Sequence, residues 1–543
     1  MRANKFLSFA LLSALLLLAG TEAQAAARWA LDLGGPAWEA LTSVRQTADS
    51  GFILAGYQPY HSLSAAWCVK LDPLGNVVWQ RTYGGSVAYV PNSVCPTSDG
   101  GYIVAGSKHP ALVYPWCLKL DQLGNVVWQK SYEALGVSSS ASAIRQTVDG
   151  GYILAGHASP IGHHDPDMFL AKLDSSGNII WQKLIGWAGD DYGSDVYQTS
   201  DAGYVAIGRA EASTFDVLVT RLDAAGNPLW MRTYGGIGAD EGYSIQQTSD
   251  GGFVAAGKTD SWGSGGDAWC FKLDANGNMV WQRAYGGAGY DAATAIQQTG
   301  DGGYAMFGRT DQPGGGTNAW LIKLDSSGLV SWARTYGTGD WLYGAEDGQQ
   351  TSEGGFAFCG RFTPGANHDG IVIRTALDGS IDASCGSLVQ PSTPVVTTTS
   401  AAVVSQSGTY SSPLVAAIAA ATPATPSSVS AILCSFGNAS DWTGAWQNLR
   451  RKRLRVMGRF TVTNIGTISG GAGTVKIYLS NNQQAGRRAK LVKSFNIPNL
   501  STDQSHTLNI RTSPSSKHKY LVAVIQNSSD IDVSNNTVAI LLP

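Results

Sequence analysis

The sequence predicts an all-β protein in which a seven-bladed β-propeller is followed by an immunoglobulin-like β-sandwich. Three observations lead to this prediction. One phrase recurs about every 50 residues along most of the chain, glycine is abundant (66 residues) while charged residues make up only 14%, and strand-like alternation returns near the C-terminus. Such a composition favours many short strands joined by tight turns over helices.

The first 27 residues have the pattern of a signal peptide. Arg2 and Lys5 precede an apolar stretch from Phe6 to Ala19, and small residues follow from Thr21 to Ala27. We expect cleavage near Ala25 or Ala27 and a secreted, extracellular or cell-surface protein, with the periplasm as an alternative. No other apolar run approaches the roughly 20 residues of a membrane helix, so we expect a soluble mature protein with no transmembrane segment.

The repeated phrase is K-L-D-x-x-G-N-x-x-W, and a period near 50 residues indicates a propeller or a solenoid. Its copies begin at Lys70, Lys119, Lys172, Arg221, Lys272 and Lys323. The corresponding tryptophans are Trp29, Trp79, Trp128, Trp181, Trp230, Trp281 and Trp332. Each unit alternates like four short strands separated by D-G-G and G-N turns, in which glycine or asparagine supplies a positive φ. Four antiparallel strands make one propeller blade.

The two ends of the array favour the closed propeller. The last unit runs through residues 370–380 and stops without a tryptophan strand, whereas Arg28–Gly35 matches that missing strand at the other end. Pairing between the two would close the ring and remove exposed sheet edges. We therefore assign residues 28–385 to a seven-bladed propeller closed by its N-terminal strand.

The phrases W-x-x-x-Y-G-G, T-x-D-G-G-[FY] and K-L-D-x-x-G-N-x-x-W, from Trp29 to Ser384, resemble the propeller repeats of secreted bacterial proteins. This resemblance implies the fold and leaves the function open.

Residues 386–440 are rich in Ser, Thr, Ala, Val and Pro and carry almost no charge, as in PSTPVVTTTS. Such a segment buries too little apolar surface to fold alone, so we interpret it as a linker or stalk. Cys385 and Cys434 bracket it and could form a disulfide in an oxidising compartment, although spacing alone does not establish that pairing.

Residues 441–543 contain about seven short alternating segments, as in an immunoglobulin-like sandwich. FTVTNIG at Phe460 and DIDVSNNTVAI at Asp530 resemble the bacterial cell-adhesion-related domain CARDB. Asp532 and Val533 depart mildly from that family's acidic residue next to serine. The resemblance implies an accessory or adhesive module.

Charge divides the chain unevenly. Residues 441–543 hold 14 Lys or Arg against four Asp, whereas the preceding residues carry an excess of acids. The densest basic patch is Arg450, Arg451, Lys452, Arg453 and Arg455. It could meet an anionic surface such as envelope polysaccharide or lipid head groups, dock on the acidic propeller, or simply be solvated. An exported chain without stacking motifs near this patch is not expected to bind nucleic acid.

Acidic residues recur in the long connections on one face of the predicted propeller. Asp191, Asp240 and Asp291 lie between blades, and Asp167, Asp216, Asp267 and Asp369 lie between second and third strands. They could bind Ca²⁺ or a cationic or hydroxyl-rich ligand, and apart from Ca²⁺ we expect no cofactor. Alternatively they cap turns through backbone N–H groups. Ala65 and Tyr114 replace the second acid in the first two blades, which argues against a seven-fold ring.

No motif for catalysis or metal binding stands out. His157, His163, His164 and Asp165 lie close in sequence, but no second cluster has metal-ligand spacing, so we predict no metal site. Cys68, Cys117 and Cys270 share one strand position and are expected in the core. There is no G-x-S-x-G phrase, and we name no catalytic residue.

These observations favour a monomeric, non-catalytic binding or scaffold protein, with a polysaccharide or cell-surface ligand. One alternative is a propeller enzyme, either a carbohydrate-active lyase or hydrolase or a quinoprotein dehydrogenase, since the L-D-x-x-G-N-x-x-W phrase resembles the tryptophan docking motif of quinoproteins. Those enzymes usually have eight blades and often adjacent cysteines, which are missing here. A purely structural envelope component is the other alternative.

Overall fold

The computed structural model describes most of residues 28–381, seven short strands between 389 and 433, and seven strands between 442 and 541. Residues 35–37, 61–62, 85–86, 111, 133–137, 160–164, 188, 212–213, 264, 312–315, 338–341 and 363–367 are not described. The chain divides into two compact units, one of residues 1–382 and 386–433 and the other of residues 383–385 and 434–543. The predicted signal peptide, Cys385 and Cys434 lie outside the described residues.

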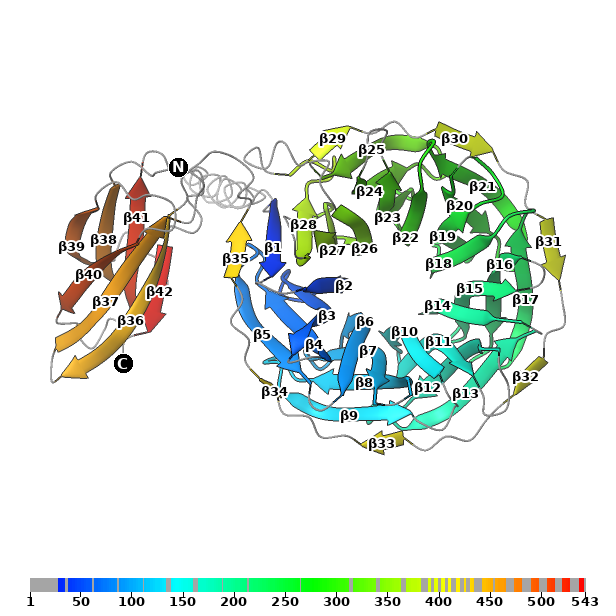
Figure 1. Ribbon diagram of the computed structural model, residues 1–543, viewed down its shortest axis with the longest axis horizontal. Coiled ribbons are helices and arrows are strands. Elements are labelled where there is room, and N and C mark those ends of the chain that lie inside the picture. The colour runs from blue at the N-terminus through cyan, green and yellow to red at the C-terminus, as the bar shows by residue number, and fades with distance from the viewer. Residues whose placement is uncertain are drawn as a thin grey trace, which may run out of the picture. The chain divides into compact units, whose positions relative to one another are not determined.

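The first unit is a β-propeller of seven antiparallel sheets arranged around an axis (Figure 1). From the axis outward, blade 1 contains β2 (Ala40–Gln46), β3 (Phe52–Tyr60), β4 (Leu63–Leu71) and β5 (Val77–Tyr83). Blade 2 contains β6 (Ala88–Pro96), β7 (Tyr102–His109), β8 (Tyr114–Leu120) and β9 (Val126–Tyr132). Blade 3 contains β10 (Ser138–Gln146), β11 (Tyr152–Ser159), β12 (Asp167–Leu173) and β13 (Ile179–Gly186).

The other four blades repeat this order. Blade 4 contains β14 (Asp191–Gln198), β15 (Tyr204–Glu211), β16 (Phe215–Leu222) and β17 (Pro228–Gly235). Blade 5 contains β18 (Asp240–Gln247), β19 (Phe253–Thr259), β20 (Asp267–Leu273) and β21 (Met279–Gly286). Blade 6 contains β22 (Asp291–Gln298), β23 (Tyr304–Asp311), β24 (Thr317–Leu324) and β25 (Val330–Tyr336). Blade 7 contains β26 (Leu342–Gln350), β27 (Phe356–Phe362), β28 (Asp369–Thr375) and β1 (Trp29–Gly34).

The N-terminal strand joins the last blade to the rest of the ring. β1 pairs antiparallel with β28, with Trp29 opposite Arg374 and Leu33 opposite Gly370. Blade 7 therefore takes strands from both ends of the repeat array, and its outer tryptophan comes from the N-terminal side.

Within a blade, the repeated Thr, Asp and Lys of T-x-D-G-G and K-L-D form one hydrogen-bonded group. In blade 1, Lys70 Nζ lies 2.9 Å from Asp49 Oδ2 and 2.7 Å from the Leu71 carbonyl oxygen. The Asp49 carboxylate also accepts a hydrogen bond from the Gly51 backbone N–H at 3.1 Å. The lysine side chain is almost wholly buried, so these bonds satisfy an ammonium group that could not otherwise stay inside the blade.

Between blades, the repeated Trp and Tyr reach the G-N turn of the next blade. Trp79 Nε1 donates to the Gln122 carbonyl oxygen at 3.1 Å, and Tyr83 OH donates to the Gly124 carbonyl oxygen at 2.7 Å. Gly124 has a φ of 77°, and a Cβ there would lie 3.0 Å from the Trp79 ring. The W-x-x-x-Y spacing is therefore explained by packing of one blade on the next.

The segment that we interpreted as a linker or stalk instead adds a fifth, outer strand to every blade. Its strands are β29 (Val389–Pro391), β30 (Val395–Thr398), β31 (Ala402–Ser405), β32 (Thr409–Ser411), β33 (Ala417–Ala419), β34 (Ala424–Thr425) and β35 (Ser430–Leu433). They pair in turn with β25, β21, β17, β13, β9, β5 and β1. This circumferential strap, residues 389–433, therefore follows the blades in reverse order and ends on the N-terminal strand (Figure 1).

The strap advances by one blade every seven residues. Equivalent outer-strand positions face Val389, Val396, Val403, Tyr410, Ala417, Ala424 and Ala431. The strap therefore meets each blade, itself about 50 residues long, in the same backbone register. The Ser-, Thr- and Ala-rich composition is thus compatible with paired strands, because the partner edge supplies the hydrogen bonds.

The second unit contains two antiparallel sheets. One has β36 (Trp442–Lys452), β37 (Arg455–Asn464) and β40 (Ser505–Thr512), and the other has β38 (Gly473–Ser480), β39 (Lys490–Ile497), β41 (Tyr520–Asn527) and β42 (Thr537–Leu541). Along β38, Val475, Ile477 and Leu479 are buried while the residues between them are partly exposed. This alternation is typical of a sheet with one covered face. Among the described residues there is no helix long and apolar enough to cross a membrane.

Candidate functional site

The predicted acidic residues lie on one face of the propeller, where the chain passes from blade to blade. Asp191, Asp240 and Asp291 are the first residues of the innermost strands β14, β18 and β22. Asp167, Asp267 and Asp369 begin the third strands β12, β20 and β28, and Asp216 is the second residue of β16. We call this the loop face.

Most acids of the loop face are buried, Asp167 and Asp216 are partly exposed, and the acids that begin inner strands cap the preceding loop. Asp191 and Asp240 are 0% exposed. Asp191 Oδ2 accepts from the Trp187 backbone N–H at 2.6 Å, and the equivalent bonds from Gly236 to Asp240 and from Gly287 to Asp291 are each 2.8 Å. The capping alternative therefore describes the inner acids, which do not form a ring of carboxylates open to a ligand.

The acids occur in pairs across blade junctions. A Cβ on Gly186 would lie 2.3 Å from Asp167 Oδ1 and 2.3 Å from Asp191 Oδ2. On Gly235 it would lie 2.0 Å from Asp216 Oδ1 and 2.8 Å from Asp240 Oδ2, and Gly286 stands in the same relation to Asp267 and Asp291. Each glycine is the last residue of an outer strand, so its missing side chain leaves the room in which the two carboxyl groups meet.

A fourth pair includes an acid that the sequence analysis missed. Glu39 is 6% exposed and precedes β2, and its backbone N–H donates to the His368 carbonyl oxygen at 2.8 Å, next to Asp369. Asp191 and Asp291 make the same cross-blade bond to Pro166 and Gly266. Aligning the inner-strand positions of all seven blades would have identified Glu39. It lies in the first sequence repeat, where the repeat pattern is weakest.

Burial shifts these carboxyl groups toward the neutral form. Burial and, to a lesser degree, the neighbouring Asp167 raise the pKa of Asp191 to about 7. Burial together with the partner acid raises the pKa of Asp216 and of Asp267 to about 6. In β1, burial with Asp369 and Glu39 raises the pKa of Asp32 to about 7. Like charges close together in a dry site favour protonation.

Partly exposed titratable side chains of the loop face come from the residue that follows the glycine in each second strand. In blades 3 to 7 these residues are His157, Arg209, Lys258, Arg309 and Arg361. With the tyrosines and glutamates beside them they form what we call the aromatic–cation rim.

Contacts along the aromatic–cation rim link neighbouring blades. Arg209 lies over the Tyr192 ring at 4.6 Å and bonds Glu241 of the next blade at 2.5 Å. Arg309 lies 4.6 Å from the Tyr290 ring centre and donates to its hydroxyl at 2.9 Å. The guanidinium groups are therefore held in place by stacking and by hydrogen bonds.

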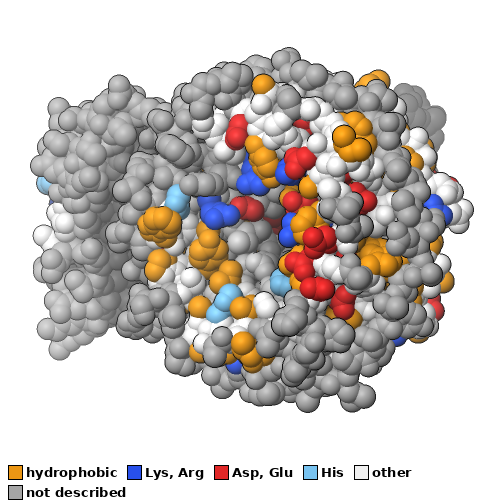
Figure 2. Space-filling view, turned by 45° about the vertical axis from the view of Figure 1, so that its right-hand side comes forward, with side chains coloured by type: hydrophobic (Ala, Val, Ile, Leu, Met, Phe, Trp, Pro, Cys, Tyr) orange, Lys and Arg blue, Asp and Glu red, His pale blue; other side chains and the backbone are white. Residues whose placement is uncertain are grey.

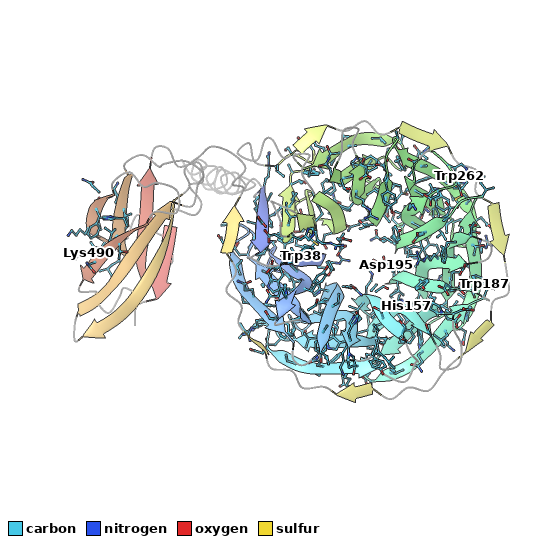
Figure 3. All side chains as sticks on the ribbon, in the orientation of Figure 1. Trp38, His157, Trp187, Asp195, Trp262 and Lys490 are labelled. Carbon is cyan, nitrogen blue, oxygen red and sulfur yellow. The ribbon has the colours of Figure 1, made fainter. Side chains whose placement is uncertain are left out.

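Tryptophans add apolar area to the same face. Trp38 is 59% exposed and packs edge-on against His368, with ring centres 4.4 Å apart. Trp262 is tilted against the buried Trp269, with ring centres 5.4 Å apart. Figure 2 shows acidic, basic and hydrophobic side chains around a hollow in this face, and Figure 3 shows Trp187 and Trp262 farther from the axis than Asp195 and His157.

The axis of the propeller holds a cavity of about 210 Å³. Arg45, Arg145, Tyr197 and Asp347 are among the residues that line it. Arg145 Nη2 lies 3.0 Å from Asp195 Oδ1, and Arg45 is ion-paired with Asp347. The two arginines are balanced by two acids, so the cavity is polar and close to neutral.

The other residues singled out in the sequence either pack inside the propeller or lie outside the described residues. Cys68, Cys117 and Cys270 are fully buried, and burial raises the pKa of each thiol. His157 packs against Tyr192, and burial lowers the pKa of its imidazole. His163 and His164 are not described, and the described residues contain no group of three metal-ligating side chains.

The basic patch lies around one hairpin of the second unit. Arg450, Arg451 and Lys452 end β36, Arg455 begins β37, and Lys452 is opposite Arg455 in the register. Arg453 lies outside the described residues.

Comparison with known proteins supplies no family. No protein-family model matches the chain, and no curated protein is similar to it in sequence. Among solved structures, the chain is similar to Sqt1 from Chaetomium thermophilum, with 11% identity and a TM-score of 0.38 over 63% of this chain and 86% of that chain. The blade pairings, and not this distant similarity, establish the propeller.

Proposed function

We propose that the chain is an exported, non-catalytic binding and scaffold protein that holds its ligand on the loop face of the propeller. The observation that carries this proposal is the aromatic–cation rim, in which cations of blades 4 to 7 lie over partly exposed tyrosine rings or pair with glutamates. Flat apolar faces beside paired donors and acceptors suit a hydroxyl-rich polymer, so a polysaccharide or other cell-surface component is the proposed ligand class.

The proposed binding site is tested by a glycan screen with the whole protein. Trp38→Ala and Arg309→Ala should each weaken binding of any glycan retained by the wild type about tenfold or more, because the first removes an exposed ring of the loop face and the second a cation of the rim. Val148→Ala is the matched control, since Val148 is 88% exposed on a turn between the first and second strands, at the opposite face. Equal loss in all three variants would contradict the proposed face.

The burial of the loop-face acids and the packing of the repeated tryptophans also bear on the enzyme alternatives. The inner acids of the loop face are buried and already hold loop N–H groups, so they are poorly placed to reach a substrate. The repeated tryptophans pack on the next blade, which supports a structural role over quinone docking. Turnover of polysaccharide by the wild type, or a quinone absorbance after reconstitution, would overturn the non-catalytic proposal.

For the second unit we propose an immunoglobulin-like, CARDB-type adhesive module whose basic patch meets an anionic polymer of the cell surface. Its two antiparallel sheets support the fold assignment. Substituting Arg450 and Arg451 by Glu in the whole protein should abolish salt-sensitive retention on an anionic polysaccharide column. Retention that is unchanged by these substitutions would favour the solvated-surface alternative.

A further inference from the structure

At each blade junction two positions face each other, and either both carry a carboxyl group or neither does. At each junction, the residue at the start of one blade's third strand is matched with a residue at the start of the next blade's inner strand. The seven matched positions are Ala65 with Tyr89, Tyr114 with Ser139, Asp167 with Asp191, Asp216 with Asp240, Asp267 with Asp291, Asn318 with Leu342, and Asp369 with Glu39. Acids that only capped turns would have no reason to appear together, so the two carboxyl groups of a junction depend on each other.

The groups also meet in space. At Gly235 the Asp216 and Asp240 carboxyl groups converge on one point, at 2.0 and 2.8 Å from where a Cβ would stand, and at Gly286 the corresponding distances are 1.9 and 2.7 Å. Three of these residues are deeply buried, with Asp240 0%, Asp291 1% and Asp267 4% exposed, while Asp216 is partly exposed. Among the described residues, the Oδ1 atoms of Asp216, Asp240, Asp267 and Asp291 have no hydrogen-bond partner.

In the part of the chain that the structure describes, no ion pair neutralises the negative charge of these carboxyl groups. The charged groups that act on these carboxyls are other acids: Asp240 on Asp216, Asp291 on Asp267, and Asp311 on Asp291. Asp240 and Asp291 also accept hydrogen bonds from threonine or serine hydroxyls and from backbone N–H groups. None of the ion pairs in the described part of the chain includes any of these four residues. Two ionised carboxylates buried together without a counter-ion would be strongly destabilising.

We propose that each junction pair shares one proton, and that the proton-sharing pairs fasten the loops of the loop face and make its binding pH-dependent. A shared proton supplies a donor to one of the unpartnered oxygens and removes one of the two charges. A proton shared in this way lies between one oxygen of each carboxyl group and needs no additional room.

The pairs are placed to control the aromatic side chains of the loop face. Asp191 accepts from the backbone N–H of Trp187, and Asp240 accepts from the Ser261 hydroxyl at 2.7 Å, next to Trp262. Glu39 directly follows Trp38, and Asp291 directly follows Tyr290. Loss of the shared proton would set two anions against each other at the base of these loops. The proposed pH dependence of binding rests on the proposed function, whereas the proton sharing itself does not.

The direction of the pH effect follows from the raised pKa values. Because the folded protein holds these protons more tightly than the unfolded chain, the stabilisation is complete below the unfolded aspartate pKa of about 4. It is lost as the pH rises through about 6 to 7, the range reached by Asp216, Asp267 and Asp191.

The test is the melting temperature of the ligand-free protein between pH 5 and pH 8, for the wild type and for Asp216→Asn with Asp267→Asn. Asparagine keeps the shape and donates from its amide, as the shared proton does, and Asn318 occupies the equivalent position of blade 6. The wild type should lose stability over this range, and the double variant should lose less and melt about 3 °C or more above the wild type at pH 8.

Asp260→Asn is the matched control, because Asp260 lies on the same face but is ion-paired with Lys258 at 2.9 Å. It should keep the wild-type slope. A second readout is the infrared band of a protonated carboxyl at neutral pH, which should weaken in the double variant. Identical slopes in wild type and double variant would overturn the proposal. So would a rise in the wild-type melting temperature with Ca²⁺ at fixed pH that the double variant lacks, since the pairs would then hold a cation.

These measurements separate the two proposals. If the pH slope behaves as expected and no glycan is retained at either pH, the proposed function fails while the proton sharing stands. If a glycan binds equally well at pH 5 and pH 8 despite the slope, the link between the pairs and binding is overturned.

Discussion

Arg374 in β28 is ion-paired with Glu353, and Nη2 lies 3.2 Å from Oε2. In the other blades this place is taken by an aspartate with a lysine, as for Lys70 and Asp49, or with an arginine, as for Arg221 and Asp201. Blade 7 pairs a glutamate with an arginine, so the acid and the cation differ between blades while the ion pair between the two positions is kept. The T-x-D-G-G and K-L-D phrases are therefore two halves of one interaction within each blade.

Breaking the equivalent ion pair of blade 3, between Lys172 and Asp149, should destabilise the propeller moderately. Lys172→Met keeps the apolar stem but leaves the Asp149 carboxylate and the Leu173 carbonyl oxygen without their 2.9 Å contacts. Because Asp149 is more than half exposed, we expect a loss of only about 1 kcal/mol. Chemical denaturation provides the measurement, and Lys172→Arg combined with Asp149→Glu, which copies blade 7, should recover most of the loss. A loss equal to that of Lys172→Met in this double variant would argue against matched pairing.

The same aspartates predict an acid limit to stability. Hydrogen bonds from threonine and lysine side chains and from a glycine N–H outweigh burial and lower the pKa of Asp99, Asp149, Asp250 and Asp301 to about 2. Since their folded pKa values are depressed, these groups stabilise the fold above the unfolded value of about 4, and that stabilisation is lost as the pH falls toward 2. Melting curves between pH 2 and pH 5 should show this decline, and a flat profile would contradict it.

The G-N turns offer a paired glycine test of blade packing. Gly124→Ala meets two penalties, since Gly124 has a φ of 77° and a Cβ would crowd Trp79 at 3.0 Å. Gly150→Ala has a similar φ of 80° but open space around it, so it measures the backbone penalty alone. We expect Gly124→Ala to cost about 1 kcal/mol more than Gly150→Ala in unfolding free energy. Equal costs would mean that the Trp79 contact is not tight.

The propeller could be predicted from the sequence because its blades repeat conspicuous residues. The contact between Trp79 and Gly124 recurs at every junction, and the Tyr83 hydrogen bond recurs at most of them, so the spacing of these residues records the fold directly. The acid pairs were harder to find, since Asp216 and Asp240 belong to different repeats and meet only when blades are set side by side. Their burial was not evident either, because aspartates in loops are ordinarily exposed.

The strap was misinterpreted because its repeat involves few large residues. Val396 and Ala417 occupy equivalent places on their blades, but their types differ, and the segment around them is mostly Ser, Thr, Ala and Pro. Such a composition is typical of a linker. Only the pairing partners reveal the seven-residue step, since a strand added to an existing edge needs backbone hydrogen bonds more than particular side chains.

Hydrogen exchange provides a direct test of the strap. Strap pairing should protect outer-strand amides that would otherwise face solvent, such as those of Arg232–Gly235 in β17, which pair with β31. A chain in which residues 389–433 are deleted, with the flanking segments joined, should exchange these amides at least tenfold faster. The inner strands β14 and β15 keep all their partners and serve as the internal control. Unchanged exchange in β17 would show that the strap does not pair there in solution, whereas faster exchange throughout the blade would indicate that the strap also supports the ring as a whole, because β35 lies on the closing strand β1.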